Sequence, residues 1–310
     1  MKTAPFVAHW QAGPVLAGGF TARMRLDDER LFAGHYPGAP MLPGSFLIEA
    51  LAQAVCSVLG DGAALREIVS CRFHSPLRPG DELSARFRLG EGRADGTLVE
   101  ITARARAQTA ELTMIMGPPP AAGRDANPPV DSASRDVASA RALDAAFIAR
   151  ALPHRPPALL VDSALMLPGT ATRSALIARK AITAAEPGFA AETAPGGYPA
   201  TLVIESFCQS CGLLRAATAK AGDARDEDKV PVVAKLAGLR LLGTAAPGDA
   251  LEHHVELVVR APEGAVFTGQ TRVAGRVLME VGRVVAALVP LSAIRPTSPR
   301  QSGDPYDGQT

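Results

Sequence analysis

The stretch FAGHYPGAPMLPGSFLIEALAQ, residues 32–53, decides the fold because it joins a stiff loop to a buried helix. Two Pro-Gly pairs and a third proline restrict the backbone of the loop. The run that follows, from Gly44 to Leu59, contains no proline and is apolar nearly all round, which is typical of a helix buried on every side. We therefore predict one central helix around which other elements wrap.

The chain carries a second copy of this unit. PGSFLIEALAQ (43–53) and YPATLVIESFCQ (198–209) both end in two apolar residues, a Glu, three residues and a Gln. A later Pro-Gly-Asp landmark, followed by Leu, recurs in the same order at 78–89 and 246–257. We therefore interpret the chain as two diverged copies of one unit, with a second helix from about residue 200 to 219.

Alternating β-rich runs follow each predicted helix, as expected for strands with one solvated face. The predicted strands are 68–73, 83–89, 98–108, 112–116, 230–242, 251–260, 265–274 and 277–288. Each copy is therefore predicted to be α+β, an antiparallel sheet around a long helix. Neither copy shows βαβ alternation or a Gly-rich phosphate loop, which argues against a nucleotide enzyme.

The length of 310 residues suits about two domains. We place the first at 1–117 and the second at 141–292. The segment between them, 118–140, has the Pro-rich composition of a linker, and the tail, 293–310, has that of a disordered segment. The polar stretch 220–229 accounts for a surface-loop insertion in the second copy.

Composition describes a soluble globular chain, with 47% hydrophobic and 20% charged residues. A formal charge of +1 gives no overall attraction for nucleic acid or an anionic membrane, and we expect neither partner. No apolar run reaches the ~18 residues of a membrane helix. Four cysteines are too few to staple a chain of this size, so we expect a reducing, cytoplasmic location.

Each predicted helix carries a glutamate and a glutamine one turn apart. Glu49 and Gln53 share a face of the first helix, as Glu205 and Gln209 do in the second. Burial disfavours an ionised carboxylate, so we expect the pKa of these glutamates to rise toward the range of a general acid. The glutamine could hold the carboxyl group in orientation.

His35 is the candidate base, because the stiff loop places its imidazole just before a helix start. That helix start offers free backbone N–H groups, Gly44 among them, for a developing oxyanion. We interpret His154 as part of a structural turn, and Cys208 and Cys211 as helix residues rather than zinc ligands. The neighbours His253 and His254 should point to opposite faces of a strand, at the surface.

The run from Leu31 to Gln53 resembles the signature of the 3-hydroxyacyl-ACP dehydratases, a Gly-His-aromatic-Pro-Gly loop entering a helix with Glu and Gln. LPHRPPALLVD (152–162) and AEPGFAAETAPGGYPATLVIESFCQ (185–209) resemble the lead-in, loop and helix of the same family. The resemblance implies a hot-dog fold in each half, joined side by side as a pseudo-dimer. The dehydratase domains of polyketide synthases are similar double hot-dogs.

The second copy departs from this signature, because the position that should carry histidine is Glu192 or Thr193. In the resembled family, histidine and acid come from opposite hot-dogs. The resemblance therefore implies one working site, with His35 and Glu205 catalytic and with Gly44 and Gln209 binding the oxyanion or substrate. Glu49 and Gln53 would be a vestigial site.

The resemblance further implies dehydration of a 3-hydroxyacyl thioester on acyl carrier protein, in fatty acid or polyketide biosynthesis. His35 would remove the α-proton and Glu205 would protonate the departing hydroxyl, so we expect no metal and no cofactor. The protein would be a monomeric pseudo-dimer or a homodimer. A non-catalytic hot-dog partner and a hot-dog thioesterase are the alternatives. An R-specific enoyl-CoA hydratase is disfavoured because the sequence has no Asp-x-Asn-Pro-x-His run.

Overall fold

A computed structural model describes residues 6–16, 18–60, 62–93, 95–120, 139–169, 174–184, 197–219 and 229–295. The linker expected at 118–140 falls almost entirely outside these residues. So do the stretch 220–228 and the loop segment 185–196, which contains Glu192 and Thr193. Within the described residues, no helix has the length and apolar character needed to cross a membrane.

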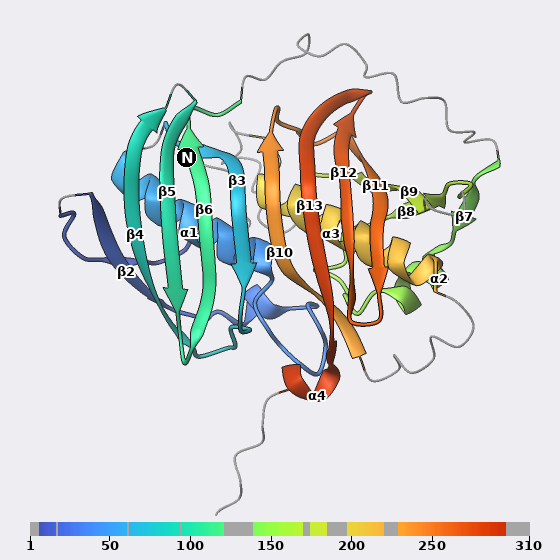
Figure 1. The fold of residues 1–310 in the computed structure, drawn as a ribbon, viewed down its shortest axis with the longest axis horizontal. Helices are drawn as coiled ribbons and strands as arrows, with labels where there is room; N and C mark the ends of the chain where they lie inside the picture. The colour runs from blue at the N-terminus through green and yellow to red at the C-terminus, as the bar shows by residue number, and fades with distance from the viewer. Residues whose placement is uncertain are drawn as a thin grey trace, which may run out of the picture.

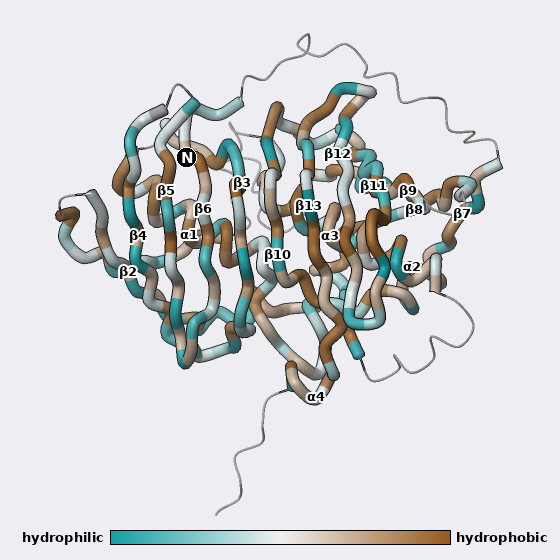
Figure 2. Tube along the Cα trace, in the orientation of Figure 1, coloured by the Kyte–Doolittle hydropathy of each residue, from teal (hydrophilic) through white to brown (hydrophobic). Residues whose placement is uncertain are grey.

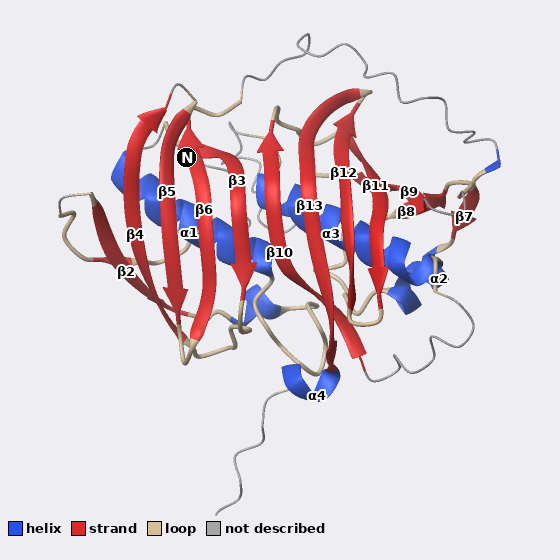
Figure 3. Ribbon diagram, viewed as in Figure 1, coloured by secondary structure: helices blue, strands red, loops and turns tan. Residues whose placement is uncertain are grey.

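Two long helices lie against one face of a broad antiparallel sheet (Figures 1 and 3). They are α1 (Gly44–Leu59) and α3 (Ala200–Ala217), which start where the sequence predicts. Most of their side chains are buried, in keeping with a helix that is apolar nearly all round. Figure 2 shows hydrophobic segments along α3 and the strands that cover it.

The first half contributes six strands to the sheet. They are β1 (Gln11–Ala12), β2 (Gly19–Arg25), β3 (Ala64–Phe73), β4 (Glu82–Arg93), β5 (Gly96–Arg104) and β6 (Gln108–Gly117). A short 3-10 helix, η1 (Glu29–Phe32), precedes the His35 loop. The predicted strand 98–108 runs too far, because the chain turns after Arg104 and β6 begins at Gln108.

The second half repeats the pattern with one added short strand at its edge. Its strands are β7 (Arg141–Leu143), β8 (Ser163–Met166), β9 (Ser174–Ala181), β10 (Lys229–Leu241), β11 (Ala250–Ala261), β12 (Gly264–Val273) and β13 (Arg276–Pro290). Two shorter helices complete it, α2 (Ala145–Ala151) and α4 (Leu291–Ile294). The strand order is β1-β2-β4-β5-β6-β3-β10-β13-β12-β11-β9-β8-β7, so the order of the second half mirrors that of the first.

The two halves join through β3 and β10, which pair antiparallel with Leu236 opposite Cys71. Within the described ranges, the result is one continuous sheet of 13 strands and a large hydrophobic core that includes residues of both halves. The α+β class and the double hot-dog arrangement, with the two hot-dogs side by side, are as the sequence predicts. This junction also brings the start of each long helix close to the middle of the other.

Two local predictions are wrong. The boundary of the tail expected at 293–310 is too early, because Ile294 belongs to α4 and is buried against Tyr36 and Met41 of the His35 loop, whereas 296–310 lie outside the described residues. His253, expected at the surface, is fully buried and lies within hydrogen-bonding distance of Ser206 and Thr271, whereas His254 on the other face is half-buried. The alternation of the two histidines was predicted, but the choice of the solvent face was not.

Candidate active site

The His35 loop is fixed against the other half of the chain. Gly34 has a positive φ of 74°, and a Cβ there would lie 2.1 Å from the carbonyl oxygen of Arg155, so only glycine fits. The N–H of Arg155 donates to the carbonyl of Gly34 at 2.8 Å. The loop of the first half therefore docks on the turn at 152–155 of the second half.

His35 is buried, and its ring is held in one orientation. Its Nδ1 lies 2.9 Å from the carbonyl oxygen of Met41. A carbonyl oxygen only accepts, so Nδ1 carries the proton and Nε2 keeps a lone pair. Burial lowers the pKa of His35, against the opposing effects of Glu205 and the Met41 carbonyl. The imidazole is therefore a neutral base at pH 7.

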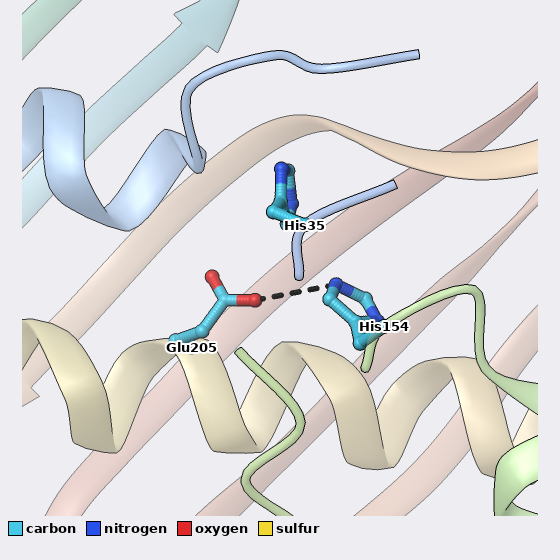
Figure 4. A group of neighbouring side chains, drawn as sticks. All are labelled: His35, His154 and Glu205. Atoms are coloured by element: carbon cyan, nitrogen blue, oxygen red, sulfur yellow. Dashed lines mark ion pairs between the residues drawn. The ribbon is translucent and has the colours of Figure 1, made fainter. Parts of the chain in front are cut away.

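Glu205 extends from α3 toward His35, although the two residues belong to different halves (Figure 4). Ligand atoms of His35, His154 and Glu205 all lie within 4.8 Å of one another. The Glu205 carboxylate accepts from Ser45 Oγ at 2.8 Å and from Gln209 Nε2 at 3.1 Å. Ser45 belongs to α1, so the first half orients the acid of the second.

The expected rise in the pKa of Glu205 is wrong. Burial does raise it, but His154, His35 and the donors Ser45 and Gln209 stabilise the carboxylate and lower the pKa below its usual value. The sequence predicted the burial of the helix. It gave no sign that two imidazoles and two hydrogen-bond donors converge on the same carboxylate.

His154, interpreted from the sequence as part of a structural turn, lies in the site. Its Nε2 is 3.5 Å from Glu205 Oε1, and its ring centroid is 5.1 Å from that of His35 (Figure 4). Burial lowers its pKa to about 4, so this imidazole is also neutral at pH 7. The LPHR run at 152–155 was the signal in the sequence, but nothing in its spacing placed His154 beside Glu205.

Gln209 orients the acid and also holds the turn that carries His154. Its Oε1 accepts from the N–H of Leu160 at 2.9 Å, and its Nε2 donates to the carbonyl of Ala158 at 2.7 Å as well as to Glu205. Both N–H bonds of the amide are therefore used within the protein. The expected orienting role fits this geometry better than the expected contact with substrate.

Glu49 and Gln53 repeat the arrangement of Glu205 and Gln209 in the first half. Glu49 accepts from Thr201 Oγ1 at 2.9 Å and from Gln53 Nε2 at 3.0 Å. Gln53 also bridges the lead-in segment, through the carbonyl of Phe6 and the N–H of Ala8, each at 2.8 Å. Within the described ranges, His35, His154 and Glu205 form the only group of three or more histidine, cysteine or carboxylate side chains with ligand atoms this close together, and Glu49 is not part of it.

A cavity of about 390 Å³ opens onto the site. His35, His154 and Glu205 line one part of it, and the rest is mainly apolar, with residues from the start of α1, the middle of α3, β10 and β13. Gly44 lies at the wall as the first residue of α1, so its N–H has no partner within the helix. A Cβ at Gly44 would lie 2.8 Å from Phe73 Cζ. The site thus combines an apolar cavity, a base, a carboxyl group and an N–H donor.

The same three side chains also offer two imidazoles and a carboxylate, a donor set that zinc accepts. Their spacing of up to 4.8 Å is wider than the roughly 3.3 Å between neighbouring ligands about 2 Å from a tetrahedral ion. Cys208 and Cys211 lie one turn apart on α3, and both form part of the cavity wall. As placed, these groups suit proton transfer better than metal binding.

Residues 16–110 match the family described as "ApeI-like: ApeI dehydratase". Among curated proteins, the chain is 37% identical over 137 residues to the 3-hydroxyacyl-[acyl-carrier-protein] dehydratase FabZ of Anaeromyxobacter sp. (strain Fw109-5), covering 43% of this chain and 82% of that protein. It is 36% identical over 100 residues to FabZ of Ligilactobacillus salivarius, covering 29% and 71% respectively.

Solved structures of polyketide synthase dehydratase domains share the fold over nearly the whole chain. The domain from the CurJ module of curacin polyketide synthase superposes with a TM-score of 0.65 at 12% identity, covering 95% of this chain and 99% of that one. The dehydratase domain of PpsC from Mycobacterium tuberculosis gives 0.62 at 18% identity, covering 92% and 99%. At these identities the likeness concerns the double hot-dog architecture alone.

Proposed function

The chain belongs to the 3-hydroxyacyl-[acyl-carrier-protein] dehydratase family, and from that premise we propose that it removes water from a 3-hydroxyacyl thioester to give the 2-enoyl thioester. The observation that carries the proposal is the meeting of His35 and Glu205, from opposite halves, at one end of an apolar cavity. Fatty acid and polyketide biosynthesis are the pathways that use this reaction.

We assign the base to His35 Nε2, which holds the free lone pair of the ring. It removes the proton on the carbon next to the thioester carbonyl. The N–H of Gly44, which no helix carbonyl accepts, stabilises the negative charge that develops on the thioester oxygen. The bond between C3 and its hydroxyl then breaks as the 2,3 double bond forms.

Glu205 supplies the proton that turns the 3-hydroxyl into water. In the free protein its pKa is lowered by the two histidines and the two donors. An acyl chain that fills the cavity excludes water from the carboxyl group, and this desolvation favours the protonated form. Ser45 and Gln209 keep the carboxyl group directed at the cavity in both its ionised and its protonated form.

The expected partner is acyl carrier protein, which would deliver the substrate on its phosphopantetheine arm. The site is complete within one chain, which supports a monomeric pseudo-dimer with one working site. We retain the division into hot-dogs at 1–117 and 141–292 as a proposal. It is supported by the mirrored strand order on either side of the β3–β10 junction. A cytoplasmic location fits the four free cysteines.

Incubation with a panel of 3-hydroxyacyl carrier proteins, followed by intact-protein mass spectrometry, tests the proposal. Loss of 18 Da, about one water, from the acyl group is the expected result. Release of the free acid would instead identify a thioesterase. No reaction at any chain length, together with copurification of a second hot-dog protein, would identify a non-catalytic partner subunit.

A further inference from the structure

A second cavity lies beside the acyl cavity and has a different chemical character. Its charged lining residues are three arginines, Arg78, Arg106 and Arg295, and the rest of its wall is prolines and the small residues Ser292 and Ala293 of α4. None of the described residues that line it is acidic. A concave site with this composition favours an anion.

Three chain segments form the partition between the two cavities. The loop places Met41 against the acyl cavity and its neighbour Pro40 against the arginine cavity. In the segment before β4, Leu77 lines the acyl cavity and Arg78 lines the arginine cavity. In the C-terminal segment, Ile294 lines the acyl cavity, Arg295 lines the arginine cavity, and Ala293 lines both. The arginine cavity therefore shares a wall with the acyl cavity and lies at the protein surface, where Arg106 and Arg295 are exposed.

The arginines are only partly neutralised by the protein. Arg106 Nε lies 2.8 Å from Asp81 Oδ1, and the same carboxylate accepts the backbone N–H of Arg78 through Oδ2 at 2.8 Å. Arg78 Nη2 donates to the carbonyl of Arg295 at 3.3 Å. Its Nη1 is shielded from solvent and has no hydrogen-bond partner within the described ranges. Asp81 thus pairs with the guanidinium group of Arg106, and within the described ranges no carboxylate forms an ion pair with Arg78 or Arg295.

We propose that Arg78, Arg106 and Arg295 bind the phosphodiester of the carrier protein's phosphopantetheine arm, an assignment that rests on the proposed dehydratase function. Guanidinium groups match the geometry of phosphate oxygens and donate in pairs. The thioester end of the arm must reach His35 inside the acyl cavity, whereas the phosphate end must stay outside it. The arginine cavity meets this requirement, because it lies at the surface and is separated from the acyl cavity by a shared wall.

The inference also gives α4 a function. This short helix carries Ser292 and Ala293 into the arginine cavity and Ile294 into the acyl cavity. Because Ile294 packs against the His35 loop at Tyr36 and Met41, the phosphate site is held in a fixed relation to the base. Binding energy at the phosphate would therefore help to place the reacting carbon, which is how remote contacts raise kcat.

Kinetics with three carriers of the same 3-hydroxyacyl group test the assignment: the carrier protein, coenzyme A, and N-acetylcysteamine, which has no phosphate. We expect Arg106→Ala and Arg295→Ala each to lower kcat/KM about fivefold with the first two substrates and to leave the third unchanged. Arg88→Ala is a matched control, because Arg88 is 77% exposed against 76% for Arg106 and also pairs with a carboxylate, Glu100. Arg78 is half-buried, so we replace it with glutamine to avoid leaving a cavity. Arg78→Gln should lower kcat/KM with the same two substrates as Arg106→Ala and Arg295→Ala.

An equal loss with N-acetylcysteamine would overturn the assignment, since the effect would then be structural. A loss with the carrier protein alone would also overturn it, because the arginines would then recognise the protein surface and not the phosphate. Calorimetry with free phosphopantetheine and with pantetheine separates the inference from the proposed function. We expect the phosphorylated compound to bind more tightly, and the difference to disappear in Arg106→Ala/Arg295→Ala, whether or not the protein dehydrates any substrate. Equal binding of the two compounds would refute the phosphate site even in an active dehydratase.

Discussion

Ser45 Oγ donates a 2.8 Å hydrogen bond to Glu205 Oε2, and this bond crosses the junction between the two halves. The mirrored bond runs from Thr201 Oγ1 to Glu49 Oε2 at 2.9 Å. Each long helix therefore uses a hydroxyl near its start to hold the glutamate of the other. The pseudo-twofold relation survives in the acids and their donors, although the described cluster with two histidines includes Glu205 and not Glu49.

The difference between the two glutamates gives the first prediction. His35→Ala and Glu205→Gln should each lower kcat by about 10²- to 10⁴-fold, the usual contribution of a positioned acid or base. Glu49→Gln should retain most of the activity, because the described cluster of His35, His154 and Glu205 does not include Glu49. Steady-state rates with a 3-hydroxyacyl carrier protein provide the measurement. If Glu49→Gln were inactive and Glu205→Gln active, the pairing across the halves would be wrong.

The two hydroxyls provide a matched pair of variants. Ser45→Ala removes one donor from the Glu205 carboxylate, and we expect kcat to fall about 10- to 100-fold, as for the loss of one hydrogen bond to a charged group. Thr201→Val removes the mirrored donor from Glu49 and should leave kcat unchanged. Thermal unfolding of both variants checks that they remain folded. Equal effects on kcat would mean that the two hydroxyls serve only the helix junction.

Much of this architecture could be predicted from the sequence. The helix at Gly44–Leu59 and the repeat of Glu and Gln are strong signals, because a helix that is apolar nearly all round can only be buried. The strands β2 and β9 gave no such signal. β9 reads SALIARKA, which is rich in residues that favour helices, and its pairing with β11 overrides that local preference.

The site was predicted only in part, because some of its residues carry a local sequence signal and others are placed by contacts distant in sequence. His35 and Glu205 carry sequence signals of their own, and the structure brings them together. His154 could not be placed, since its position depends on contacts distant in sequence: the bond of Gln209 to Ala158 and the bond of Arg155 to Gly34. The lowered pKa of Glu205 has the same origin, because it results from several side chains that only the folded chain collects.

His154 should act as a positioning residue for Glu205. It is the neighbour that lowers the pKa of Glu205 most, so His154→Gln should raise that pKa and shift the basic limb of the kcat–pH profile to higher pH. A purely structural role would change the rate without moving the limb. The pH profiles of the wild type and of His154→Gln, measured in the same buffers, separate the two roles.

Gly44 has two functions that one variant can separate. Gly44→Ala keeps the backbone N–H, but its Cβ would lie 2.8 Å from Phe73 Cζ, so the ring must move into the cavity wall. We expect KM to rise for long acyl chains more than for short ones. Gly62→Ala is the control, because a Cβ at Gly62 has nothing within 4 Å. A second change, Phe73→Leu, should restore the affinity; if it does not, the steric account fails.

The buried His253 predicts acid sensitivity. Its pKa is lowered by burial to about 3, while in the unfolded chain it titrates near 6.5. Between these values the unfolded chain binds one proton more than the folded chain. The contribution of His253 is therefore fully present above pH 6.5 and is lost as the pH falls toward 3, by up to about 1.4 kcal/mol per pH unit.

Urea unfolding at pH 7 and pH 5 measures this dependence. His253→Gln, which keeps polar atoms between Ser206 and Thr271, removes the titrating group and should reduce the loss of stability on acidification. His154 and Glu205, whose pKa values are also lowered, contribute in the same direction, so part of the acid sensitivity should remain in His253→Gln. Equal slopes in His253→Gln and in the wild type would show that His253 binds its proton equally well in the folded chain, so that burial does not lower its pKa.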